Sequence, residues 1–290
     1  MKNIADSVKA RLKNIADAKK MNFDFICLKY LQERLLYRLS VSKYKTNFVL
    51  KGGLMLNFLK ASEYRPTKDI DFLGIKVNND PEQLKNIFKE ICLVECEDGV
   101  LFDHDSIETS VIKEGMEYEG TRLKLIAHLG SVRIVMTLDI GFGDIITYGA
   151  KISEYQTLLK MDNPSIYIYP FETVIAEKFE SIVKLNYQTS RMKDFYDIYF
   201  ISQSYNFDIE KLRKSIQATF EKRSTKISDS EVVFSNEFKT EPKFEIQWKA
   251  FIRRSNLNLE LSFQEIVEYI ETFIKPIINK ISLKYKKEFE

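Results

Sequence analysis

Two aspartates, Asp69 and Asp71, stand one residue apart in the segment KDIDFLGIKV, which has the composition of a strand. Residues i and i+2 of a strand point to the same face, so the two carboxylates would lie side by side. Such oxygen ligands suit Mg²⁺, which keeps waters and recruits substrate phosphates. The alternative is an exposed edge strand whose carboxylates pair with lysines. A second pair of this spacing, Asp103 and Asp105, lies in a polar stretch that predicts a loop.

A pair of glycines, Gly52 and Gly53, follows the short apolar run NFVLK. A strand that ends in two glycines lets the backbone approach a ligand closely, and the N-terminus of a following helix offers free N–H groups to phosphate. The spacing matches neither a P-loop nor a dinucleotide-binding motif. The feature is therefore either a phosphate site or a tight strand-to-helix turn.

Asp139 is a third candidate carboxylate, in the apolar and β-branched run RIVMTLDIGF. This run predicts an interior strand, where an unpaired carboxylate would be costly. If this strand lies beside the one that carries Asp69 and Asp71, the three would form a metal site. The alternative places Asp139 at a strand end, paired with a surface lysine or capping a turn.

Lys178 lies within the apolar stripe of the segment PFETVIAEKFESIVKL, four residues after Val174 and four before Ile182. A lysine at such a position must extend to the surface or meet an anion. A bound triphosphate would satisfy it, and so would an internal partner such as Asp194 or Asp197.

Charged residues also run through the apolar segment RMKDFYDIYF, namely Arg191, Lys193, Asp194 and Asp197. Their spacings fit ordinary helix pairs, each worth ~0.2–0.5 kcal/mol. The surrounding aromatic residues indicate burial, however, and charges inside packed helices usually belong to a network or contact a ligand. Both interpretations remain open.

The elements that would position these residues fall into two groups. Helices are predicted over residues 1–18, 24–40 and 54–60, with a further helix beginning at Pro81. Strands are predicted for the runs NFVLK, KDIDFLGIKV and SIYIYP and, antiparallel to one another, between residues 108 and 142. After Pro170 the periodicity is helical over residues 171–185, 192–203, 209–220 and 263–283, with a polar loop or linker over residues 221–243. The sequence thus predicts an α+β domain with a mixed sheet over residues 1–170 and an all-helical domain over residues 171–290.

The composition excludes several classes of protein. The 290 residues carry a net charge of +2, which neither demands nor excludes a nucleic-acid partner. The odd set Cys27, Cys92 and Cys96 predicts reduced thiols in a cytoplasmic protein. His104 and His128 have no partner at metal spacing, which argues against a zinc site or histidine-based acyl transfer. No apolar run predicts a signal peptide or a membrane span.

In their order along the chain, these motifs resemble the nucleotidyltransferase toxins of the AbiEii/AbiGii abortive-infection type, within the DNA polymerase β-like superfamily. The blocks that carry the resemblance are ERLLYRLSVSKY, FVLKGGLML, RPTKDIDFLG, LDIGF, AEKFESIV and RMKDFYDIYF. The resemblance implies a polymerase β-like nucleotidyltransferase domain with N-terminal helices, a helical C-terminal domain, and an antitoxin encoded nearby.

The resemblance also implies roles for the motif residues. It assigns Asp69, Asp71 and Asp139 to metal binding and catalysis, Lys178 to catalysis beside the triphosphate, and Lys51, Gly52, Gly53, Lys178, Arg191, Lys193, Asp194 and Asp197 to nucleotide binding. One departure concerns Gly53 and Leu54, which supply no hydroxyl where relatives often carry Ser or Thr. Phosphate binding would then depend on backbone N–H groups.

The function that follows is Mg²⁺-dependent transfer of a nucleotide from an NTP to an acceptor hydroxyl, expected on RNA such as a tRNA end. The protein would act as the toxin of a toxin–antitoxin or phage abortive-infection system. Three alternatives remain. They are an NTP-binding switch of the same fold that transfers nothing, a D-x-D glycosyltransferase, which leaves the glycine turn and Lys178 unexplained, and an interaction protein whose charged motifs are salt bridges.

Overall fold

The computed structural model describes residues 2–59, 65–114 and 118–288, and it divides into two compact units. The first unit comprises residues 1–58, 67–143 and 150–168. The second comprises residues 59–66, 144–149 and 169–290. Two short segments that precede residue 169, residues 59–66 and 144–149, therefore belong to the second unit.

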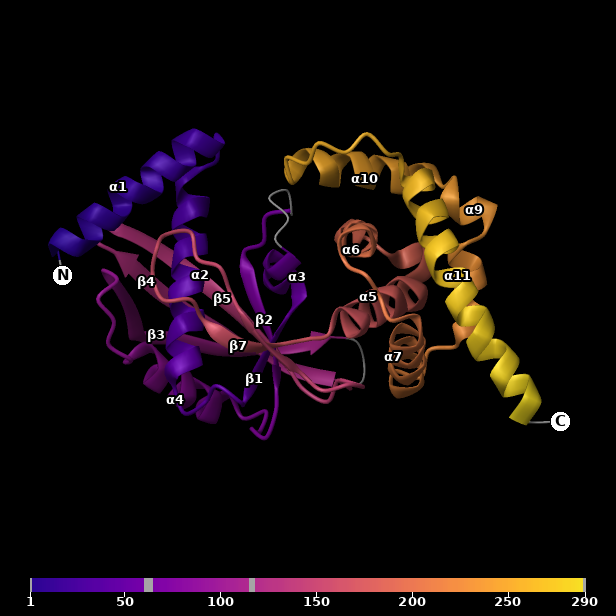
Figure 1. Cartoon of the computed structure of the whole chain (residues 1–290), viewed down its shortest axis with the longest axis horizontal. Coiled ribbons are helices and arrows are strands. Elements are labelled where there is room, and N and C mark those ends of the chain that lie inside the picture. The colour runs from indigo at the N-terminus through magenta and orange to yellow at the C-terminus, as the bar shows by residue number, and fades with distance from the viewer. Residues whose placement is uncertain (1, 60–64, 115–117, 289–290) are drawn as a thin grey trace. The chain divides into compact units, whose positions relative to one another are not determined.

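The first unit is built on a mixed sheet whose strands, among the described residues, run in the order β3-β4-β5-β2-β1-β7-β6 (Figure 1). The strands are β1 (Phe48–Lys51), β2 (Asp69–Gly74), β3 (Val100–Glu114), β4 (Tyr118–Leu129), β5 (Val132–Gly141), β6 (Lys151–Glu154) and β7 (Ser165–Ile168). The pairs β2–β5 and β1–β7 are parallel, and the other neighbours are antiparallel. The expected mixed sheet and the antiparallel β3–β4–β5 group are both present.

Helices cover one face of this sheet. They include α2 (Phe23–Val41) and α4 (Pro81–Cys92), which contact each other, while α1 (Lys2–Lys19) contacts α2. Phe88 of α4 packs against Phe48 and Phe72, with ring centroids 5.1 and 6.4 Å away. The α4 helix begins as predicted, with the Asp80 side chain accepting from the Glu82 N–H group. The core of the unit lies between this helical layer and the sheet.

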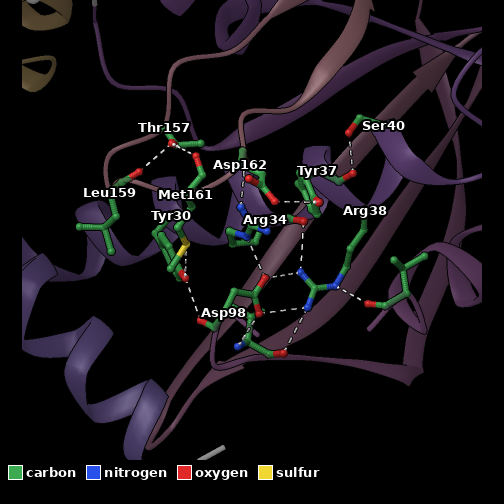
Figure 2. A network of polar contacts seen from close by, with 12 residues as sticks. Tyr30, Arg34, Tyr37, Arg38, Ser40, Asp98, Thr157, Leu159, Met161 and Asp162 are labelled. Carbon is green, nitrogen blue, oxygen red and sulfur yellow. Dashed lines mark hydrogen bonds and ion pairs between the residues drawn. The ribbon is translucent and has the colours of Figure 1, made fainter. Parts of the chain in front are cut away.

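A buried carboxylate fastens α2 to the loop that precedes β3, as Figure 2 shows. Arg34 Nε and Arg38 Nη1 donate to Asp98 Oδ2 at 2.8 and 2.7 Å, and the Val100 N–H group donates to Oδ1 at 3.0 Å. The Tyr30 hydroxyl donates to the Asp98 carbonyl at 2.7 Å. Burial alone would raise the pKa of Asp98, but the two guanidinium groups outweigh it and hold the pKa below its ordinary value.

The second unit is helical, with α5 (Phe171–Leu185) packed on α6 (Met192–Ser204) and α7 (Ile209–Lys222) (Figure 1). The remaining helices are α8 (Ser230–Val233), α9 (Asn236–Lys239), α10 (Pro242–Arg254) and α11 (Phe263–Glu288). An aromatic cluster joins α6, α9, α10 and α11, and its members are Phe195, Phe238, Phe244, Trp248 and Phe263. This cluster forms the core around α11.

Most predicted helices agree with the structure within a few residues, but three local expectations are wrong. Residues 221–243 are not a linker, because Val233, Phe234 and Phe238 are buried in and beside the short helices α8 and α9. The helix expected over residues 54–60 is instead α3 (Gly52–Met55), followed by a 3₁₀ turn over residues 56–59, and residue 60 lies outside the described part of the chain. Strand β6 and helix α10 had no counterpart in the prediction.

The third wrong expectation concerns Asp103 and Asp105, which lie within β3 and not in a loop. The strand is irregular here, since its register with β4 shifts between Asp103 and Glu108. Asp103 Oδ1 accepts from the N–H groups of Asp105 and Ser106, a bonding pattern typical of turns. This local turn within the strand explains why the sequence resembles a loop. None of the described helices is long and apolar enough to cross a membrane.

Candidate active site

The strand β2 presents its two aspartates on one face, as its alternation predicts. Ile70 and Phe72 are 0 and 1% exposed on the helix-covered face, whereas Asp69 is exposed and Asp71 half-buried on the other. In the ladder, Asp71 is the register partner of Lys51 on β1 and of Asp139 on β5. Since register partners point to the same face, Lys51, Asp71 and Asp139 form one row across three strands. The structure therefore places Asp139 on an interior strand beside the D-x-D pair.

The glycine turn lies directly against this row. Gly52 has φ +66°, a left-handed conformation that favours glycine, and a Cβ atom at this position would lie 2.0 Å from Asp71 Oδ2. Lys51 also extends toward β5, because its Nζ would lie 3.3 Å from a Cβ atom at Gly141, two residues beyond Asp139. The two sequence motifs, KGG and DID, thus meet at atomic distance.

Arg122 completes the row on the next strand, β4, where it is the register partner of Asp139. Its Nε and Nη2 donate to the two carboxylate oxygens of Asp139, each at 2.7 Å. This bond, together with the charges of Asp139, Asp69 and Asp71, raises the pKa of Arg122 above its ordinary value. The guanidinium group is therefore bonded to Asp139 and lies within electrostatic reach of Asp69 and Asp71.

The sequence reasoning missed Arg122, although a signal was present. The run TRLKLIAHL alternates, with Leu123 and Leu125 buried and Arg122 and Lys124 on the opposite face. Pairing this strand with RIVMTLDIGF would have placed a cation opposite Asp139. The prediction considered a cationic partner for Asp139 only as a surface lysine.

The oxygen donors of this row suit a hard divalent cation. Asp69 and Asp71 share one face, and Asp139 adds two oxygens on the adjacent strand. Within residues 2–59, 65–114 and 118–288, however, no three acidic, histidine or cysteine side chains converge into a ready metal cluster. Mg²⁺ is commonly held by one or two carboxylates together with waters and substrate phosphates. The residues fit a metal bound in that way, with Asp139 already engaged by Arg122.

The second unit brings together the charged residues of α5 and α6. Lys178 Nζ donates to Asp194 Oδ1 at 3.0 Å and to Asp197 Oδ2 at 2.6 Å, and both carboxylates are 0% exposed. Burial alone would lower the pKa of Lys178, but the charges of Asp194 and Asp197 outweigh it and raise the pKa. The internal partners considered for Lys178 are therefore present.

Two arginines complete this network. Arg65 forms a bidentate pair with Asp197, with Nε–Oδ1 2.7 Å and Nη2–Oδ2 2.8 Å, and the Arg191 guanidinium donates to Asp194 Oδ2. These cations and Lys178 overcome burial and hold the pKa values of both aspartates below the ordinary 3.8. Lys193, by contrast, is exposed. The sequence analysis also missed Arg65. Its position four residues before Asp69 gives no indication that its partner lies on a helix that begins at Met192.

A mixed sheet with aspartates at i and i+2 of one strand, a glycine turn against the second of them and a helical second unit is the arrangement expected of a nucleotidyltransferase. Residues 34–269 match the family described as nucleotidyl transferase AbiEii toxin, type IV toxin–antitoxin system. The chain belongs to this AbiEii family, and it is a nucleotidyltransferase of the toxin type.

Solved structures agree with this fold. The structure of JHP933 from Helicobacter pylori superposes with a TM-score of 0.53 at 14% identity, covering 92% of this chain and 97% of that chain. A candidate nucleotidyltransferase from H. pylori gives a TM-score of 0.53 at 15% identity, covering 90% of this chain and 98% of that chain. No curated protein matches the chain.

Proposed function

We propose that the protein transfers a nucleotide from an NTP to a hydroxyl group of an RNA acceptor, such as a tRNA end, with Mg²⁺ as its cofactor. The observation that supports this most is the row formed by Lys51, Asp71 and Asp139 beside the Gly52 turn. The carboxylates of this row can bind a metal. The Lys51 cation and the backbone of the Gly52 turn can contact a phosphate. Such transfer, acting in the cytoplasm, would arrest growth as expected of a toxin.

The proposed reaction forms one bond and breaks one. The acceptor hydroxyl oxygen attacks the α-phosphorus of the NTP, the bond from that phosphorus to the α–β bridging oxygen breaks, and pyrophosphate leaves. The hydroxyl proton passes to solvent. When bound, Mg²⁺ would neutralise phosphate charge and lower the pKa of the attacking hydroxyl. Asp69 and Asp71 would hold the metal, with Asp139 as the third carboxylate.

The remaining roles concern the nucleotide. Lys51 and the N–H groups of Gly52 and Gly53 would contact phosphates. A lysine cation forms charge-assisted hydrogen bonds with phosphate, and glycine lets the backbone approach it closely. By family resemblance we also propose that Lys178, Arg191, Lys193, Asp194 and Asp197 contribute to nucleotide binding. The buried ion pairs of Lys178 would additionally hold α5 to α6, so its two contributions need separate measurements.

The decisive experiment incubates the purified protein with each labelled NTP, Mg²⁺ and total RNA, and follows label on the RNA. We expect transfer by the wild type and loss of transfer in D69N/D71N. The matched control is D103N/D105N, which removes the other D-x-D pair, on β3, and is expected to transfer normally. Absence of label on any acceptor, or equal transfer by D69N/D71N, would overturn the proposal. Tight NTP binding without transfer would instead support the NTP-binding switch.

The family also implies an antitoxin partner. We propose that it is encoded beside this gene as a small regulator of transcription. Co-expression of the neighbouring reading frame should relieve growth arrest caused by the wild-type toxin. Arrest that persists with every neighbouring frame would contradict this assignment.

A further inference from the structure

The pair formed by Arg122 and Asp139 is placed where a metal ligand would be needed. Arg122 donates a hydrogen bond of 2.7 Å to each oxygen of the Asp139 carboxylate. The Arg122 side chain is 40% exposed and that of Asp139 is 22% exposed. A bidentate guanidinium–carboxylate pair is among the stronger polar contacts in proteins, and its geometry fixes the carboxylate orientation. Asp139 is therefore held by a cation of the protein itself.

The row gives this pair a direct relation to the proposed metal. Asp139 lies on β5, between its register partner Arg122 on β4 and its register partner Asp71 on β2. A divalent cation shared by Asp71 and Asp139 would approach Asp139 from the β2 side, while the guanidinium holds it from the β4 side. The two cations would repel each other, and each would reduce the charge that Asp139 offers to the other.

We propose that Arg122 is a positioning residue that competes with the divalent cation for Asp139, so that the third carboxylate becomes a metal ligand only when Arg122 releases it. This inference rests on the proposed metal-dependent function and deepens it. Its consequence is that the nucleotide-free protein binds the metal more weakly than its three carboxylates alone would. Premature metal binding without substrate would thereby be limited.

Lys124 offers a matched control for this competition. It lies on the same face of β4, two residues from Arg122, and it is exposed. Its register partner on β5 is Thr137, which in turn pairs with Asp69. Replacing Lys124 removes one positive charge from the same face without removing a bond to Asp139. It thus separates direct competition from the general effect of charge.

The experiment is a calorimetric titration of the nucleotide-free, full-length protein with Mn²⁺ as the probe. We expect R122Q to bind Mn²⁺ about tenfold more tightly than the wild type, within the usual range of coupling between two ligands. R122K, which keeps the charge but loses the bidentate grip, should fall between the two. D139N should bind more weakly, and replacing Arg122 should increase affinity much less in the D139N background than in the wild type.

Three outcomes would overturn the inference. They are unchanged or weaker Mn²⁺ binding by R122Q, a gain of the same size in R122Q/D139N relative to D139N, and an equal gain in K124Q. Unfolding curves for each variant establish that the protein titrated is folded. Because the titration needs neither NTP nor RNA, it is independent of transfer. Tighter Mn²⁺ binding by R122Q, with no RNA labelling by the wild type, would overturn the proposed function alone. RNA labelling by the wild type, with no tighter Mn²⁺ binding by R122Q, would overturn this inference alone.

Discussion

Gly52 and Asp71 approach each other so closely that no side chain fits between them. A Cβ atom on Gly52 would lie 2.0 Å from Asp71 Oδ2 and 2.6 Å from its Cγ. The glycine is thus required for a reason beyond its positive φ, because it gives the Asp71 carboxylate room in the row. The glycine motif and the aspartate motif are two sides of one steric arrangement.

Replacing Gly52 with alanine should therefore displace Asp71. We expect G52A to lose Mn²⁺ binding and to lower the free energy of unfolding by more than the ~1–2 kcal/mol of a left-handed non-glycine residue. Thermal unfolding and Mn²⁺ titration measure the two effects. The control is G149A, where φ is +70° but nothing lies within 4 Å of the added Cβ. Equal losses in the two variants would show that backbone strain alone is responsible.

The network around Lys178 predicts a large effect on stability. In K178M, Asp194 and Asp197 would each lose one cationic partner at a fully buried position. Breaking a buried ion pair by removing one partner typically costs ~3–5 kcal/mol, so urea unfolding should show a loss of about that size. K184M, on an exposed position of the same helix, should change the unfolding free energy by less than ~0.5 kcal/mol. A stable K178M protein that has lost nucleotide binding would indicate a role confined to the ligand.

Asp98 predicts a stability effect that depends on pH. Its folded pKa lies below the ordinary 3.8, so its contribution is present above that value and is lost as the pH falls below it. D98N should lower the unfolding free energy by ~3–5 kcal/mol at pH 7, since Arg34 and Arg38 lose their buried counter-charge. The difference from the wild type should shrink below about pH 4. D162N, which alters an exposed carboxylate that accepts from Tyr37, serves as the control.

Local sequence patterns predicted much of the fold, and the predictions that failed did so for physical reasons. The helix α5 was predicted at its observed bounds, Phe171–Leu185, because its apolar stripe is continuous. Alternation placed Asp69 and Asp71 on one face, since the side-chain period of a strand is fixed. Residues 221–243 failed because a few buried aromatic side chains, such as Phe238, can hold short helices in a mostly polar segment.

The parts of the site that escaped prediction are the long-range partners. Neither the pairing of Arg122 with Asp139 nor that of Arg65 with Asp197 follows from spacing, because each depends on which elements become neighbours in the fold. Strand order was the missing information in the first case. In the second, the segment that carries Arg65 belongs to the helical unit, and no local pattern around residue 65 indicates this.

Glu33 on α2 predicts a pH dependence of the opposite sign to that of Asp98. Its side chain is 0% exposed, and Oε2 accepts from the Leu158 N–H group at 2.9 Å. Burial raises the pKa of Glu33 from 4.5 to about 8, against the opposing effect of that hydrogen bond. The folded protein therefore binds a proton here that the unfolded chain has released, so stability falls as the pH rises from about 4.5 to 8.

E33Q should remove this dependence, because glutamine keeps an acceptor for Leu158 and cannot ionise. Relative to the wild type, the unfolding free energy of E33Q should rise between pH 5 and 8 by up to ~1.4 kcal/mol per pH unit. Urea unfolding at pH 5, 6, 7 and 8 measures the difference, in which contributions from other groups cancel. E33A should share this pH dependence but be less stable than E33Q at every pH by ~1–3 kcal/mol, since the Leu158 N–H group loses its acceptor. A constant difference between E33Q and the wild type would show that Glu33 ionises normally in the folded protein.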